Sequence, residues 1–426
     1  MQEILIYTEK ISPRIEYVFE FILHEFSGLE FEFTTDLEGF KQSGFPKINF
    51  SKKSISDELQ LVPDDFLFEN TVSEKIKFEE LNEVGKIFFA LSRYEEYLPN
   101  EKDQHDRISG KNKVYKTPFM DEWILDFQLK LKQKYPRLNF KNREFELVLT
   151  CDVDQVWKYK HKGFKRDYGG FLIDFLKFDF KGISNRLNSF LGLKKDPFDT
   201  FDFFKTLSSF RADTERSRSV SEEPENVKMI FFWLMADYGK FDKNNPVKNS
   251  AFQNKIREIS KWAECGIHPS YASNFSSQKL KTEIERLENV LDKKITKSRQ
   301  HYIKLNFPET YQTLIQNGIQ EDFTMGFADE TGFRAGTCTP FFWYDLSKEE
   351  VTDLKIFPFC AMDVSMRNYM KLTIEESVQE IQRLKSEIQK VNGKMIVLFH
   401  NSNLNEEWKG WGKVLESLFK EKPLRS

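Results

Sequence analysis

Residues 147–154 read LVLTCDVD, and this stretch decides the fold class. Its first four residues, LVLT, are apolar or β-branched, and Asp152 and Asp154 follow directly. A short apolar run of this kind is typical of a β-strand. The sequence therefore predicts a strand over residues 147–150 with two carboxylates directly after it.

Similar short apolar strands recur along the rest of the chain, at residues 229–235, 265–268, 301–305, 323–327 and 395–400. Amphipathic helices lie between them. One has Leu280, Ile284, Leu287 and Leu291 on a single face, and another spans residues 374–388 behind a Thr373–Glu376 capping box. Strands that alternate with helices indicate parallel pairing, so residues 141–426 are predicted to form an α/β barrel or open sheet. Within them, residues 211–226 are polar and aperiodic and predict a mobile insertion.

Residues 1–140 predict a smaller α/β domain of their own. A helix is expected to begin at Ser12-Pro13 and to end at Gly28, followed by a strand over residues 29–34 and a second helix over residues 78–98. The polar stretch 133–142 is the predicted domain boundary. This region has no chemical motif. Its Arg93, Glu95 and Glu96 predict a solvated helix face or an interdomain contact.

Composition excludes some classes of partner. The chain has 426 residues, 64 Lys and Arg and 67 Asp and Glu, a net charge of −3 that gives no overall electrostatic case for nucleic acid or an anionic membrane. The longest apolar run, residues 229–236, is far shorter than the ~18 residues that a membrane span needs. Glu3 stands where a signal peptide would be positive, and the four cysteines lie far apart. These features predict a cytoplasmic protein with reduced thiols.

The rare ionisable groups follow the strands. Among six histidines, His268 and His400 end a predicted strand and His301 lies in another. Because the C-terminal strand ends of an α/β barrel share one face, Asp152, Asp154, His268 and His400 are expected to converge. Carboxylates with imidazoles suit zinc or a similar divalent ion. Each residue alone also has a structural interpretation, as a turn, a cap or a core hydrogen bond; their shared position favours a site.

The remaining three histidines have simpler interpretations. His24 falls in an amphipathic helix and is predicted to be structural. His105 and His161 lie in charged stretches and are predicted to be solvated.

Four short motifs, in the order in which they occur along the chain, resemble those of the polysaccharide deacetylase family (NodB-type, carbohydrate esterase family four). TCDVD at 150–154 resembles its first motif, GIHPS at 266–270 its histidine motif, and LFH at 398–400 its closing motif, while SRQH at 298–301 stands in the place of its arginine motif. The strings SRYEEYLP (92–99), DEW (121–123), DYGKFDKN (237–244), GFRAGTCTPF (332–341) and MDVSM (362–366) resemble a two-domain bacterial subgroup with an uncharacterised N-terminal domain. The resemblance implies an irregular (β/α) barrel preceded by a smaller α/β domain.

The resemblance also implies roles for single residues. Asp152 would be the general base, His400 the general acid, and Asp154 and His268 metal ligands. Arg299 and, second to it, Arg334 are the candidates for an arginine that orients the base. The family's second histidine is missing, because Ala272 stands four residues after His268. His301 is the expected replacement as third ligand.

These features predict a metal-dependent hydrolase, with zinc as the expected metal, that removes an N-acetyl or other N-acyl group from an amino sugar in a polysaccharide or glycan precursor. A divalent ion would polarise the unreactive amide and lower the pKa of bound water, while an acid–base pair moves the protons. Two alternatives stay open. One is a non-catalytic carbohydrate-binding or scaffold protein with a degenerate barrel, which the altered histidine motif favours. The other is an O-deacylase with the same site.

Overall fold

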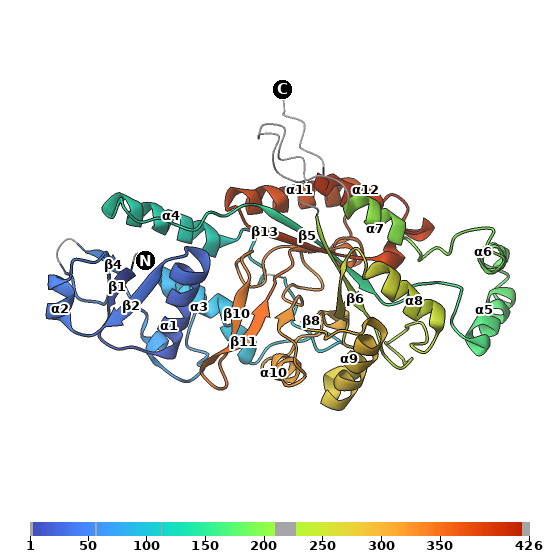
Figure 1. Ribbon diagram of the computed structural model, residues 1–426, viewed down its shortest axis with the longest axis horizontal. Helices are drawn as coiled ribbons and strands as arrows, with labels where there is room; N and C mark the ends of the chain where they lie inside the picture. Colours follow the sequence, from blue (N-terminus) through green and yellow to red (C-terminus); the bar gives the residue numbers. More distant parts are fainter. Residues whose placement is uncertain (1–2, 56–57, 112, 209–226, 420–426) are drawn as a thin grey trace, which may run out of the picture.

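The computed structural model describes residues 3–55, 58–111, 113–208 and 227–419; the predicted insertion 211–226 lies outside them. Two sheets organise the chain (Figure 1). The first, with its helices, lies at one end of an elongated molecule, and the second fills the middle. Helices α5 (Phe164–Leu176) and α6 (Phe180–Phe190) project at the opposite end.

The first sheet has four parallel strands in the order β2-β1-β3-β4. They are β1 (Glu3–Tyr7), β2 (Glu30–Thr34), β3 (Lys47–Phe50) and β4 (Leu59–Leu61). Helix α1 (Pro13–Phe19) begins as predicted, since the Ser12 side chain accepts the N–H of Ile15. It continues as a π-helix (Glu20–Phe26) and ends at Gly28, whose φ of 68° suits glycine. A short α2 (Leu37–Gln42) connects β2 to β3.

The prediction of one continuous helix over residues 78–98 is wrong. A 3₁₀ turn (Phe78–Glu80) precedes α3 (Glu83–Leu91), and a second 3₁₀ turn (Tyr94–Tyr97) follows it. Arg93 adopts a left-handed conformation with φ 53°, which breaks the helix and turns its side chain toward the second sheet. Helix α4 (Phe119–Lys134) then crosses to the second half of the chain.

The second sheet has nine strands in the order β10-β11-β9-β8-β7-β6-β5-β13-β12, parallel except for the β10–β11 pair. They are β5 (Glu146–Val153), β6 (Lys228–Trp233), β7 (Glu264–Ile267), β8 (Lys297–Ser298), β9 (Glu321–Asp322), β10 (Phe341–Asp345), β11 (Glu350–Ile356), β12 (Ala361–Met362) and β13 (Lys394–His400). β5 is the strand that LVLT predicts, and it lies inside the sheet between β6 and β13. It is longer than expected and includes Asp152.

Helices connect these parallel strands. They are α7 (Phe201–Ser208), α8 (Ser250–Ile259), α9 (Ser277–Leu291), α10 (Glu309–Gln316) and α11 (Ile374–Lys390), while α12 (Gly412–Glu416) follows the last strand. The helices expected around residues 280–291 and 374–388 are confirmed, and the capping box of Thr373 and Glu376 is formed. Among the described residues, no helix combines the length and apolar character that crossing a bilayer requires.

Two predicted strands are misplaced. The strand expected at residues 301–305 lies earlier, at β8, and the strand expected at residues 323–327 is β9. Tyr302 and Ile303 have φ values of 63° and 54°, so the backbone after His301 is left-handed and no strand can continue there. His301 therefore follows its strand, as His268 follows β7.

The predicted barrel is present only in part. In the described residues, no continuous ladder joins β12 to the β11 end of the sheet. Instead the chain itself passes across, through residues 357–360. Phe357 and Phe359 donate backbone hydrogen bonds to the Asp322 and Met325 carbonyls, and Cys360 donates to that of Ile396 on β13. The sheet thus curves so that residues 357–360 bridge its two sides, but its strands do not close into a regular barrel.

The two sheets share one hydrophobic core. Helix α1 packs against the β10–β11 hairpin, where the rings of Tyr17 and Tyr344 lie 5.0 Å apart and those of Phe21 and Phe341 lie 6.5 Å apart. All four cysteines are buried and free, as predicted. Apolar packing therefore holds the first sheet and its helices against the second sheet.

Candidate metal centre and acid–base pair

The C-terminal strand ends of the second sheet surround a cavity of about 330 Å³. Asp152 and Asp154 reach it from the end of β5, and His400 from the last position of β13. His268 follows β7 directly, and His301 follows β8 three residues on. The structure thus brings together these five residues, which lie far apart in the sequence.

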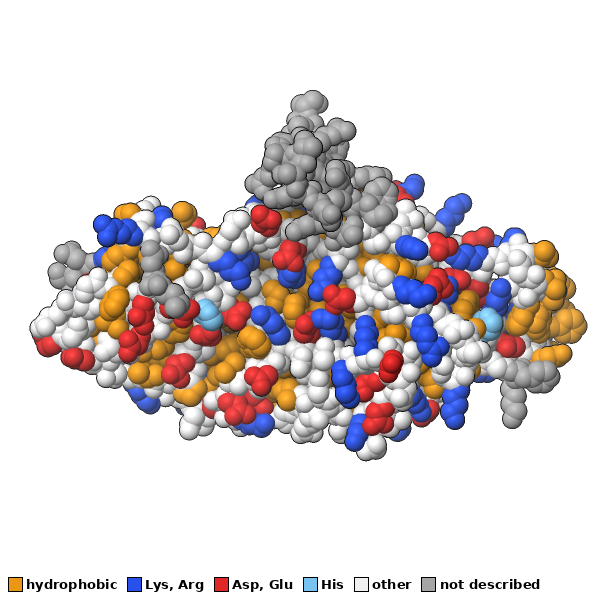
Figure 2. Space-filling model, in the orientation of Figure 1, with side chains coloured by type: hydrophobic (Ala, Val, Ile, Leu, Met, Phe, Trp, Pro, Cys, Tyr) orange, Lys and Arg blue, Asp and Glu red, His pale blue; other side chains and the backbone are white. Residues whose placement is uncertain are grey.

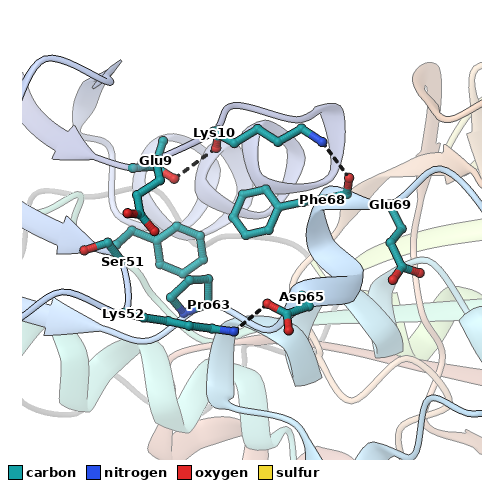
Figure 3. A pocket seen from close by; sticks show the side chains of 10 residues that line it. Glu9, Lys10, Ser51, Lys52, Pro63, Asp65, Phe68 and Glu69 are labelled. Atoms are coloured by element: carbon teal, nitrogen blue, oxygen red, sulfur yellow. Dashed lines mark hydrogen bonds and ion pairs between the residues drawn. The ribbon is translucent and has the colours of Figure 1, made fainter.

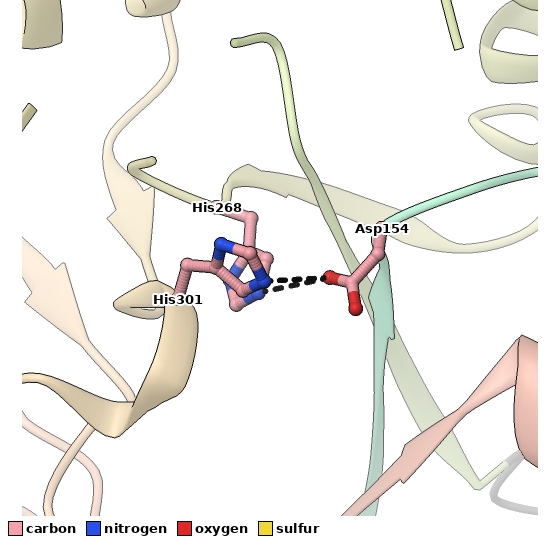
Figure 4. Close-up of side chains that lie close together, drawn as sticks. All are labelled: Asp154, His268 and His301. Atoms are coloured by element: carbon pink, nitrogen blue, oxygen red, sulfur yellow. Dashed lines mark ion pairs between the residues drawn. The ribbon is translucent and has the colours of Figure 1, made fainter. Parts of the chain in front are cut away.

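Three of these side chains form a cluster with the geometry of a metal site (Figure 4). The Oδ1 atom of Asp154 lies 3.4 Å from Nε2 of His268 and 3.5 Å from Nε2 of His301. The two imidazole rings are 4.9 Å apart. One carboxylate oxygen and two imidazole nitrogens at these distances could all contact one small ion.

Hydrogen bonds fix which nitrogen each histidine presents. Nδ1 of His268 donates to the Arg299 carbonyl oxygen at 2.5 Å, and Nδ1 of His301 pairs with Asp242 Oδ1 at 3.0 Å. Both rings therefore direct Nε2 toward Asp154. Partners of this kind are typical behind metal-binding histidines, because they hold the tautomer and the ring orientation.

Asp242 also orders the loop in which the family's second histidine would stand. Its carboxylate accepts the backbone N–H groups of Tyr271 at 2.7 Å and of Ala272 at 3.2 Å. Ala272 therefore contributes its backbone to this network, and His301 supplies the second imidazole from the next strand end.

Electrostatics around the cluster favour a cation. Burial alone would raise the pKa of Asp154, but the histidines beside it, His301 foremost, hold that pKa well below its ordinary value. Burial would lower the pKa of His301, but Asp154 and Asp242 raise it to about 9. In each case the carboxylate is stabilised by a positive charge next to it, and a divalent ion would supply that charge more strongly.

Three buried polar atoms at this point make no hydrogen bond within the described protein: Asp152 Oδ1, Asp154 Oδ1 and His268 Nε2. A buried polar atom without a partner costs about 1–3 kcal/mol, so three in one place are typical of a site that binds a ligand. One carboxylate and two imidazoles with room for water match the three-ligand set of a catalytic zinc site. The residues present fit a divalent ion.

Asp152 lies over a buried arginine. The Arg299 Nη1 atom is 3.9 Å from Asp152 Oδ1, and its Nη2 donates to the Thr150 hydroxyl at 2.9 Å. The guanidinium also contacts the rings of Phe232 and Phe359, at 5.2 and 4.9 Å from their centroids. Burial lowers the pKa of Arg299, and the nearby Asp152 opposes that change.

His400 is held by a carboxylate of its own. Asp363 accepts both the His400 backbone N–H and its ring Nδ1–H, each at 2.8 Å, and also the side-chain amide of Asn403. Burial would lower the pKa of His400, but Asp363 raises it to about 9. The ring is therefore protonated at neutral pH, and Nε2 remains for contacts in the cavity.

Arg334, the second arginine candidate, does not lie at the site. Its guanidinium binds the Glu96 carboxylate through Nε at 2.9 Å and through Nη2, and Nη1 donates to the Gly326 carbonyl. Glu96 binds Arg93 as well, at 2.8 Å. Arg334 is thus part of a buried contact between the two halves of the chain, and its candidacy as the arginine that orients Asp152 is corrected. Of the two interpretations given for Arg93 and Glu96, a solvated face is wrong, because both side chains are buried in this contact.

Other singled-out strings have comparable structural roles. Asp121, in the DEW string, accepts the Thr337 and Thr339 hydroxyls of the GFRAGTCTPF string. DYGKFDKN contains Asp242, and MDVSM contains Asp363. Asp242, which supports His301, and Asp363, which supports His400, were not predicted from the sequence, although both lie in strings that resemble the bacterial subgroup.

The N-terminal half also contributes to the cavity, which the sequence did not predict. Arg107 lines it, donating to the Tyr302 carbonyl at 2.8 Å and to the Tyr369 hydroxyl at 2.9 Å. His105, predicted to be solvated, instead packs its ring 4.7 Å from that of Tyr302. The rings of Phe241 and Tyr271 join these two, with Phe241 5.7 Å from His105. We call His105, Phe241, Tyr271 and Tyr302 the aromatic wall; it lies beside the Asp154–His268–His301 cluster.

A second cavity, of about 420 Å³, lies in the first sheet (Figure 3). It opens where β1 and β3 end, between Lys10, Lys52 and Asp65. Lys52 pairs with Asp65 at 2.6 Å, and Lys10 donates to the Phe68 carbonyl at 3.1 Å. These polar groups satisfy one another, in contrast to the unpaired atoms at the β5–β7 strand ends.

Comparisons with known proteins give distant similarities. Residues 4–136 match the profile of a family of unknown function, DUF7033. A comparison with curated proteins found no match. Among solved structures, a candidate polysaccharide deacetylase from Mycobacterium smegmatis is 15% identical with a TM-score of 0.39, covering 65% of this chain and 83% of the other.

Two further solved structures are similar at the same level. A polysaccharide deacetylase from Bacillus cereus is 12% identical with a TM-score of 0.31, covering 65% and 86%. An allantoinase is 8% identical with a TM-score of 0.36, covering 65% and 82%. Because the identities and TM-scores are low, these similarities do not establish the chemistry of this chain.

Proposed function

We propose that this chain is a metal-dependent hydrolase that removes an N-acetyl or other N-acyl group from an amino sugar in a polysaccharide or glycan precursor. One observation carries the proposal: Asp152 and His400, a carboxylate and a protonated imidazole, line the same small cavity as the Asp154–His268–His301 cluster. A base, an acid and a ligand set for a divalent ion are the three parts that amide hydrolysis needs.

Asp154, His268 and His301 would hold the ion, which when bound polarises the acyl carbonyl and acidifies a water molecule. Asp152 would take the proton of that water, with Arg299 Nη1 3.9 Å away to orient its carboxylate. His400 would give a proton to the departing nitrogen, and Asp363 keeps the ring protonated and fixed. General acid and base groups of this kind each contribute about 10²–10⁴ in rate.

The aromatic wall supports a sugar substrate. Phe241, Tyr271 and Tyr302 are half-buried, so part of each ring remains exposed near the cluster. Faces of this kind bind the apolar side of a pyranose ring, and Arg107 and Lys243 add hydrogen-bond donors at the cavity. The same proposal includes zinc as the metal and a preference for N-acyl over O-acyl groups.

The competing function is a non-catalytic glycan-binding protein, which the missing histidine at Ala272 favours. One experiment separates the two. Purified protein would be stripped of metal, reloaded with zinc, and incubated with an N-acetylated hexosamine oligomer and with an O-acetylated one. Acetate release from the first that requires zinc and disappears in Asp152→Asn supports the hydrolase. Glycan binding without acetate release from either oligomer favours the binding protein.

A further inference from the structure

Helices α5 and α6 form a hairpin with its apolar side chains on the outside. Leu176, Phe178 and Phe180 are 66–77% exposed, and Leu172 and Phe175 are more than half exposed. Figure 2 shows hydrophobic side chains gathered at this end of the molecule, where the hairpin projects. Monomeric soluble proteins rarely leave so many large apolar side chains together in water, so this face is expected to have a partner.

The inner side of the hairpin contains an ion pair among aromatic rings. Arg186 of α6 is buried and pairs with Asp174 of α5 at 2.8 Å, with its guanidinium over the rings of Tyr159 and Phe171. The ring of Phe190 lies 5.8 Å from that of Phe171. An ordinary surface helix turns its apolar stripe toward the protein and its charges toward water. This hairpin has the opposite arrangement, with an ion pair inside and an apolar face outside.

Charge around the hairpin differs from that of the whole protein. Residues 158–195 contain ten Lys and Arg but only three Asp and no Glu, within a chain of net charge −3. Lys177 and Lys194 are exposed and have no ion-pair partner among the described residues. Apolar side chains combined with an excess of cations are the pattern of helices that lie in the interface of an anionic membrane.

We propose that the α5–α6 hairpin docks this protein on the surface of an anionic phospholipid bilayer. The helices, of 13 and 11 residues, are too short to span it, so the hairpin would lie in the headgroup region with its apolar face inward. Lys181 of α6 pairs with Glu406 at 3.6 Å, and Lys158 pairs with Glu407, which ties the hairpin to the loop that follows β13. The hairpin is thus connected to the side of the sheet that carries the cavity.

Vesicle flotation with the full chain tests this proposal. The protein is expected to float with vesicles of phosphatidylcholine and phosphatidylglycerol, and much less with phosphatidylcholine alone. F175E/F178E should lower the partition coefficient at least about tenfold, because both rings would leave the lipid. K177Q/K194Q should lower it about 30-fold on the anionic vesicles only. Leu129→Glu, which replaces a 62% exposed leucine on α4, is the matched control and should change nothing.

Two results would overturn the proposal. Either the wild-type chain does not float with anionic vesicles, or both hairpin variants float as well as Leu129→Glu. A dimer in solution that F175E/F178E dissociates, with no vesicle binding, would make the hairpin a contact between two copies of this chain. Hydrolysis of a soluble substrate should be unchanged in all three variants, so a failure of this proposal and a failure of the proposed function are distinguishable.

Discussion

His400 and Asp152 are register partners on the adjacent parallel strands β13 and β5, so the two side chains leave the sheet at the same level. Both line the cavity that also contains the Asp154–His268–His301 cluster. This pairing puts the predicted base and the predicted acid side by side at one cavity, although 247 residues separate Thr150 and Val397, which are hydrogen-bonded across the same two strands.

The acid–base pair should affect turnover without affecting the metal. Asp152→Asn should retain zinc and glycan binding and lower turnover by about 10²–10⁴, since it removes only the proton acceptor. His400→Ala is expected to fall in the same range. The two losses should be less than additive in the double variant, because both groups serve one step. Steady-state kinetics of acetate release with zinc analysis measures all three. Unchanged acetate release by Asp152→Asn would contradict the proposed mechanism.

The geometry of the Asp154–His268–His301 cluster predicts that His301 contributes directly to zinc affinity. His301→Gln should weaken zinc binding by at least about 100-fold, because it removes one of three ligands. Asp242→Asn keeps all three ligands but alters the hydrogen bond behind His301 and the support of the Tyr271–Ala272 backbone, so it should weaken zinc binding by about 10–100-fold. Titration of the metal-free protein with zinc against a competing chelator gives both values.

His24→Gln is the matched control for the metal prediction. His24 lies with Glu20 and Glu25 in an exposed cluster that also has metal-ligand spacing. Affinity that depends on His24 but not on His301 would move the metal site to that cluster.

The alkaline limit of activity should depend on Asp363. His400 must be protonated to act as the acid, and its pKa is raised to about 9, so activity is lost as the pH rises through that value. Asp363→Asn keeps an acceptor for the ring but removes the negative charge, which lowers a pKa by about 1–3. The falling limb of the pH–rate profile should therefore move to lower pH. Asp353→Asn, at an exposed position of β11, should leave the profile unchanged, and an unmoved limb in Asp363→Asn would exclude His400 as the acid.

The buried Glu96 should stabilise the contact between the two halves of the chain. Burial would raise its pKa, but Arg334 and Arg93 lower it to about 2. Glu96→Gln removes the carboxylate that pairs with Arg334 and leaves Arg93 with Glu95 alone, so it should destabilise the protein by about 3–5 kcal/mol near neutral pH. Urea unfolding measures this change. Glu38→Gln breaks an exposed pair with Lys41 and should cost at most about 1 kcal/mol.

The same residue predicts a pH dependence of stability. Because the pKa of Glu96 is lower in the folded protein than its ordinary value of 4.5, its contribution is complete above pH 4.5 and is lost as the pH falls toward about 2. The difference in stability between wild type and Glu96→Gln should therefore shrink between these two values. A constant difference across that range would show that the carboxylate charge is not what stabilises the contact.

Much of the site could be predicted because it depends on local pattern. LVLTCDVD is an apolar strand followed by carboxylates, and GIHPS and LFH repeat that pattern with histidines. Parallel strands that cross over through helices bring their C-terminal ends to one side, so Asp152, His268 and His400 had to meet there. The capping box at Thr373 and the helix start at Ser12 are local in the same sense.

What the sequence by itself determined is therefore the position of strands β5, β7 and β13 and the ionisable residues at their C-terminal ends. Only the tertiary structure decided the partners of those residues: Asp242 behind His301, Asp363 behind His400, and Glu96 with Arg334. These aspartates and Glu96 lie in loops or short turns without a period of 2 or 3.6 residues, so no local pattern marks what they bind. A hydrogen bond depends on distance in the folded chain, and that distance is set by how the sheet curves and how its two halves pack.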